Sequence, residues 1–132
     1  MKFLFQPGST AFLPDRAVSA PYGMWLRQIA AKSAERSACL LLTGHASPTG
    51  TAAVNERLSS GRAERLRGRL ISERPTLRER TRARGIGARE PLVGTGVDNV
   101  SDALDRRVEL APLACGELAG AAENRSGRRS PL

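Results

Sequence analysis

An uninterrupted apolar segment between two helix-like stretches constrains the fold of this chain more than any other feature. The segment covers residues 38–43, reads ACLLLT and ends at Gly44. Its length and its lack of alternation are typical of a strand that is buried on both faces. Helical periodicity precedes it over residues 21–34 and follows it over residues 51–72. A strand between two helices predicts an α/β fold.

Both predicted helices have clear boundary signals. Pro21 occupies the first position of the first helix. Thr51 or Gly50 caps the second helix, and Pro75 follows its end. The second helix carries one apolar stripe, formed by Val54, Leu58, Leu66 and Leu70. We expect this stripe to pack against the sheet.

Polar residues near the start of the second helix predict a small ligand pocket. Asn55 and Arg62 are seven residues apart and share one helical face, close to the turn that holds Ser47. Free N–H groups at a helix N-terminus and the planar guanidinium both favour an anionic or zwitterionic ligand. Alternatively, Arg62 extends past the apolar stripe into water, and the periodicity favours neither interpretation.

Three further strands complete the expected order of elements. They cover residues 2–5, 81–87 and 107–110. A single helical turn, capped by Ser101 or Asp102, precedes the last strand. Strands that alternate with helices predict a two-layer α/β sandwich with the order βαβαβ(α)β.

The length and the composition of the chain define its organisation. A chain of 132 residues forms one domain, which we expect over residues 1–115. Residues 116–132 are rich in Ala, Gly, Ser and Arg without an apolar period, and we expect a disordered tail there. We expect neither a membrane span nor a signal peptide, because no apolar run is long enough.

The net charge of +8 arises mainly between residues 55 and 89, where eleven Arg face four Glu. Such a segment attracts nucleic acid, a membrane surface or an acidic polymer. However, nineteen Arg and only two Lys in the whole chain also fit a general bias toward Arg. The segment has no aromatic residue on which bases stack. Nucleic-acid binding is therefore disfavoured.

The chain offers few residues for catalysis or metal binding. His45 is the only histidine, and Cys39 and Cys115 have no metal-ligand spacing. A histidine in a Gly-His turn is more often a structural hydrogen-bonding group than a base, and no nucleophile elbow accompanies it. We expect no enzyme activity, no metal and no cofactor.

Six motifs follow one another along residues 1–110. They are Phe5 with Ser9, Thr43-Gly44-His45, Gly50, Asn55-x-x-Leu58-Ser59-x-x-Arg62-Ala63, Gly85-x-Gly87-x-x-x-Pro91 and Asp105-Arg106-Arg107-Val108-Glu109. In this order and spacing the chain resembles the OmpA-like (OmpA/MotB C-terminal) domain family, which includes the peptidoglycan-associated lipoprotein. The resemblance implies a mixed four-stranded sheet in which the last strand runs antiparallel beside the second.

The implied strand order brings the two cysteines together. Cys39 starts the second strand and Cys115 lies just past the last, so the resemblance implies that they are within disulfide reach. A disulfide fits an oxidising periplasm. The alternative is two unpaired thiols.

The resemblance also implies a function and a site. The function is non-catalytic binding of the peptide stem of peptidoglycan, commonly at meso-diaminopimelate, which tethers an envelope protein to the wall. The implied location is periplasmic and associated with the outer membrane. The family's ligand-binding positions fall on Ser47, Thr49, Asn55, Arg62 and Arg106.

Two positions depart from the family's pattern. Ser47 stands where the family has an Asp, and Gln6 stands where many members have an acid. A neutral group offers an ammonium hydrogen bonds about half as strong as charge-assisted ones. We therefore expect weak diaminopimelate binding or a preference for another stem-peptide group. The alternatives are a scaffold that binds envelope protein partners without binding the wall, and a basic nucleic-acid-binding domain.

Overall fold

A computed structural model describes residues 1–36, 38–48, 50–89 and 105–118 of the chain. Its helices and strands follow one another as β1 (Lys2–Leu4), α1 (Arg16–Ser19), α2 (Tyr22–Glu35), β2 (Cys39–Gly44), α3 (Ala52–Glu73), the 3₁₀ helix η1 (Pro75–Arg80), β3 (Thr81–Gly85), β4 (Arg107–Leu113) and the 3₁₀ helix η3 (Cys115–Glu117). The helical turn expected at Ser101 or Asp102 and most of the expected tail lie outside the described residues.

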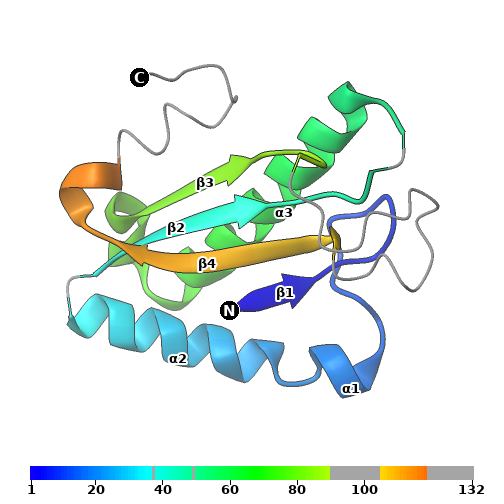
Figure 1. The fold of residues 1–132 in the computed structure, drawn as a ribbon. Coiled ribbons are helices and arrows are strands. Elements are labelled where there is room, and N and C mark those ends of the chain that lie inside the picture. Colours follow the sequence, from blue (N-terminus) through cyan, green and yellow to red (C-terminus); the bar gives the residue numbers. More distant parts are fainter. Residues whose placement is uncertain (37, 49, 90–104, 119–132) are drawn as a thin grey trace.

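The described strands form one sheet with the order β1-β4-β2-β3 (Figure 1). β4 runs antiparallel to both β1 and β2, and β2 runs parallel to β3. Thr43 of β2 therefore pairs with Glu109 of β4 on one side and with Arg84 of β3 on the other. This mixed sheet confirms the predicted α/β sandwich, including the antiparallel placement of the last strand beside the second.

One apolar core lies between the sheet and its helices. Every residue of β2 is buried, as the uninterrupted apolar segment predicts. Alternate strand residues meet both long helices and η1 in this core, which contains Phe3, Leu40, Leu42, Ala83, Val108, Leu26, Ala30, Leu66, Leu70 and Leu77. α3 crosses behind the strands in the view of Figure 1. The helices thus form the second layer of the sandwich.

The predicted apolar stripe of α3 is wrong in its first half. Val54 is 37% exposed and Leu58 is only half-buried. The first turns of α3 instead bury polar residues, because they pack against the ends of β2 and β3. A Cβ on Gly44 would overlap the backbone carbonyl of Ser59, so this close approach requires glycine.

Other differences concern short elements and boundaries. α1 and η1 were not predicted, because a turn or two of helix has no measurable periodicity. Pro21 is the N-cap of α2 and not its first helical residue. β4 extends to Leu113, three residues beyond the predicted end, because its last residues continue to pair with β2 as far as Cys39.

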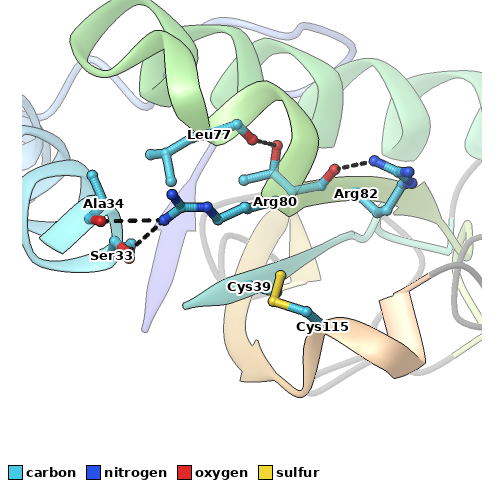
Figure 2. The surroundings of a disulfide bond; sticks show 8 residues. Ser33, Ala34, Cys39, Leu77, Arg80, Arg82 and Cys115 are labelled. Carbon is cyan, nitrogen blue, oxygen red and sulfur yellow. Dashed lines mark hydrogen bonds between the residues drawn. A yellow bond between two sulfur atoms is a disulfide. The ribbon is translucent and has the colours of Figure 1, made fainter. Parts of the chain in front are cut away.

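The disulfide joins Cys39, at the start of β2, to Cys115, just past β4 (Figure 2). In the antiparallel register Cys39 pairs with Leu113, which places Cys115 two residues away and gives a Cα–Cα distance of 5.2 Å. This confirms the implied pairing. Figure 2 also shows Arg80 donating to the carbonyls of Ser33 and Ala34, so η1 is tied to the end of α2 near the disulfide.

Candidate ligand-binding site

A pocket of about 130 Å³ lies where the chain leaves β2 and enters α3. It brings Ser47, Asn55 and Arg62 together, as the sequence predicts. Its other described lining residues are Gly8, Ala46, Gly50, Val54 and Leu58. Arg106 is not among them, and Thr49 lies outside the described residues. We call this cavity the first pocket.

Arg62 is held by the backbone of three separate segments. Its Nε donates to the carbonyl of Ser9 at 2.8 Å, Nη1 to that of His45 at 3.0 Å, and Nη2 to that of Gln6 at 2.9 Å. The residue is 1% exposed, and its guanidinium lies 5.7 Å from the centre of the Phe5 ring. Arg62 therefore does not extend into water. It fixes the pocket walls and keeps a positive charge beneath them.

The other predicted site residues have different surroundings. Ser47 and Asn55 are both buried against the pocket. Arg106 is also buried, and its Nε donates to the carbonyl of Phe5 at 3.1 Å. The Gln6 side chain donates to the carbonyl of Phe12 at 3.4 Å. Arg106 and Gln6 thus take part in bracing the end of β1.

α3 begins at the first pocket with a standard cap. The Thr51 hydroxyl accepts a hydrogen bond from the Val54 N–H at 3.2 Å. This confirms Thr51, the first of the two predicted N-cap residues. Gly50, which lies just before α3, lines the pocket, so the positive end of the helix dipole lies beside it and favours a negatively charged ligand group.

A second cavity of about 380 Å³ adjoins the first pocket and shares Gly50 and Asn55 with it. We call it the second pocket. Its other described lining residues are Pro48, Ala52, Glu56, Ile86, Gly87, Ala88 and Arg89. Glu56 and Arg89 form an ion pair there. The sequence did not predict this pocket, because Glu56 and Arg89 are 33 residues apart and meet only in the tertiary structure.

Comparison with known proteins decides which fold this is. Protein-family models and curated proteins give no match. Among solved structures, the peptidoglycan-associated lipoprotein from Burkholderia pseudomallei aligns with a TM-score of 0.68 and 24% identity, over 85% of this chain and 89% of the other. The cell wall anchor of the T6SS from Pseudomonas aeruginosa aligns with a TM-score of 0.60 and 25% identity, over 81% and 72%. The OmpA-like domain of FopA1 from Francisella tularensis aligns with a TM-score of 0.63 and 16% identity, over 86% and 72%.

The chain has an OmpA-like fold. The resemblance drawn from the sequence motifs is thereby confirmed. In this OmpA-like fold, the first pocket contains the predicted positions Ser47, Asn55 and Arg62. None of the described helices is long and apolar enough to cross a membrane.

His45 is a buried, neutral side chain beside the first pocket. It is 2% exposed, and neither ring nitrogen has a hydrogen-bond partner among the described residues. Burial, assisted by the charge of Arg107, lowers its pKa to about 4. Glu109 Oε2 lies 4.0 Å from Nε2. The expected role as a structural hydrogen-bonding group therefore holds only for the backbone of His45. Its N–H donates to the carbonyl of Arg107, and its carbonyl accepts from Nη1 of Arg62.

Glu109 itself is stabilised as a carboxylate. Burial acts to raise its pKa, but the hydrogen bond and the charge of Arg107 outweigh burial and lower it. Among the described residues, no three His, Cys, Asp or Glu side chains gather into a metal-binding group.

Much of the Arg-rich segment is built into the fold. Arg67 Nε donates to Thr81 Oγ1 at 2.8 Å, and Arg84 Nε donates to Thr43 Oγ1 at 3.0 Å. Further arginines with hydrogen bonds inside the fold are Arg62, Arg80 and Arg82. Several arginines of the segment therefore stabilise the fold by hydrogen bonds in addition to contributing positive charge.

Proposed function

We propose that this OmpA-like domain binds the peptide stem of peptidoglycan, without catalysis, and so anchors an envelope protein to the cell wall in the periplasm. The observation that supports this most is the first pocket, in which Ser47 converges with Asn55 and Arg62 from the first half of α3. Two of the similar structures bear related names, a peptidoglycan-associated lipoprotein and a T6SS cell wall anchor.

The pocket chemistry favours the carboxylate end of the ligand. The α3 N-terminus supplies a positive potential, and Arg62 supplies a fixed positive charge beneath the walls. Ser47 adds a hydroxyl, which gives an ammonium a weaker partner than a carboxylate would. We therefore propose that a diaminopimelate-type stem peptide binds through its carboxylate and more weakly than it would with an Asp at position 47.

Retention on purified cell-wall sacculi tests the proposal. We expect the wild type to be retained and Asn55→Ala to lose about tenfold in affinity, because Asn55 lines the first pocket. Ser47→Asp is expected to bind a diaminopimelate-containing muropeptide about tenfold more tightly. Arg65→Ala, exposed on the same helix, is the control and should bind as the wild type does. Absence of wild-type retention would contradict wall binding.

The bonding of Arg62 favours one other candidate, a scaffold that binds envelope protein partners. Three of the guanidinium donors already serve backbone carbonyls, which suits a structural role. The scaffold predicts no retention on sacculi and a protein partner that is captured by cross-linking. The two candidates are thus separated by the same sacculus experiment.

A further inference from the structure

We propose that the second pocket is an ammonium subsite in which Glu56 supplies the carboxylate that position 47 lacks. The inference rests on the proposed function and names the group that binds beside the first pocket. The ligand is a stem-peptide residue that carries both a carboxylate and a free ammonium. Its carboxylate lies in the first pocket, and its ammonium contacts Glu56.

The two pockets are placed for one ligand to occupy both. They share Gly50 and Asn55 as lining residues, so they lie next to each other. Gly50 has no side chain to separate them. Asn55 Oδ1 lies near this glycine, because a Cβ on Gly50 would be 3.9 Å from it. Asn55 therefore borders both parts of a bridging ligand.

The charges of the two pockets are complementary to the two ends of such a ligand. The described lining of the first pocket contains one charged side chain, the cation Arg62. The described lining of the second pocket contains the carboxylate of Glu56 beside the guanidinium of Arg89. Apolar groups of Pro48, Ala52, Ile86 and Ala88 complete this pocket and suit the methylene chain of a diamino acid.

The Glu56–Arg89 pair can give way to a ligand ammonium. Its side chains are 37% and 46% exposed, and ion pairs at such positions contribute little to stability. An ammonium that enters the pocket replaces Arg89 at the carboxylate of Glu56. Arg89 is thus a competitor for Glu56 and not a partner in binding.

This competition gives the two variants opposite effects. Titration of a diaminopimelate-containing muropeptide into Glu56→Gln should show about a threefold loss of affinity, since an exposed charge-assisted contact becomes a neutral one. Titration into Arg89→Gln should show a gain of about threefold, because the competing cation is gone. Glu64→Gln is the matched control, because Glu64 pairs with Arg67 at 3.7 Å farther along α3. It should bind as the wild type does.

A second probe tests contact with the ammonium directly. Acetylation of the free amine of the muropeptide should weaken wild-type binding about threefold and should abolish the difference between wild type and Glu56→Gln. Equal affinities of Glu56→Gln and Glu64→Gln for the free-amine probe would overturn the subsite while wall binding stands. Loss of affinity in both Glu56→Gln and Arg89→Gln would overturn it too, because the pair would then act structurally. A wild type that binds neither muropeptide nor sacculi would overturn both proposals.

Discussion

Opening the Cys39–Cys115 disulfide should lower the free energy of unfolding by about 4 kcal/mol. The bond closes a loop with a sequence separation of 76 residues. In the chain-entropy description, a loop of this length removes about 15 cal/mol/K from the unfolded state, which is about 4.5 kcal/mol at 25 °C. Such a loss is a large fraction of the stability of a small domain, which is typically about 5–15 kcal/mol.

Urea unfolding followed by the fluorescence of Trp25, the only tryptophan, measures this loss. We compare the oxidised protein with the reduced protein and with the double variant Cys39→Ala/Cys115→Ala. With a slope of about 1.5 kcal/mol/M, the midpoint should fall by about 3 M. The slope should rise slightly, because the unfolded chain expands without its cross-link.

The same experiment separates stability from binding. Cys39 begins β2, whereas the first pocket lies beyond the other end of that strand. The reduced protein should therefore keep its muropeptide affinity under conditions in which it stays folded. If the free energies of unfolding of the reduced and oxidised forms differ by less than about 1 kcal/mol, the loop-entropy reasoning is refuted. Free thiols in the untreated protein would refute the bond itself.

Three further predictions concern the packing around the site. Gly44→Ala should lower the free energy of unfolding by about 2–3 kcal/mol, since the methyl group would overlap the Ser59 carbonyl. Gly68→Ala should raise it by about 0.5–1 kcal/mol, because the added methyl group meets open space on the helix. Thermal unfolding of both variants checks this. Arg62→Met should lower the free energy of unfolding by about 3 kcal/mol or more, because three backbone carbonyls lose their hydrogen-bond donor. If Arg62→Met and the control Arg65→Met unfold at the same urea concentration, Arg62 does not stabilise the pocket walls. His45 should make the domain acid-sensitive. The pKa of His45 is about 4 in the folded protein and 6.5 in the unfolded chain, so the unfolded chain binds more protons between these two pH values. The free energy of unfolding should therefore fall by about 3 kcal/mol as the pH falls from 6.5 to 4. Urea unfolding at pH 7 and at pH 4.5 measures this. Between these two pH values the free energy of unfolding should fall less for His45→Leu than for the wild type.

The elements of this domain followed from local patterns in the sequence. The apolar segment at residues 38–43 predicted β2, and the periodicity of residues 51–72 predicted α3 to within one residue at each end. The spacing of Asn55 and Arg62 predicted that they share a pocket, because residues seven apart in a helix lie on one face. Such signals are local, so they need no knowledge of the rest of the chain.

The resemblance to a family supplied what local patterns do not. The place of the last strand beside the second, and with it the Cys39–Cys115 disulfide, depends on contacts between distant segments. Periodicity also predicted a continuous apolar stripe along α3, in which Val54 is in fact exposed. The error arose because the close approach at Gly44 turns a polar face of the first helical turns toward the sheet.

By itself, then, the sequence determined the order of the strands and the two long helices, and it placed a group of polar residues on one face of α3. Only the tertiary structure decided what those residues do. The partners of Arg62 lie 17, 53 and 56 residues away, and Glu56 meets Arg89 across 33 residues. A helix face can be read from spacing because the helix repeat is fixed, whereas a contact between loops depends on how the whole chain packs. For that reason the first pocket was predictable and the second pocket, with its carboxylate, was not.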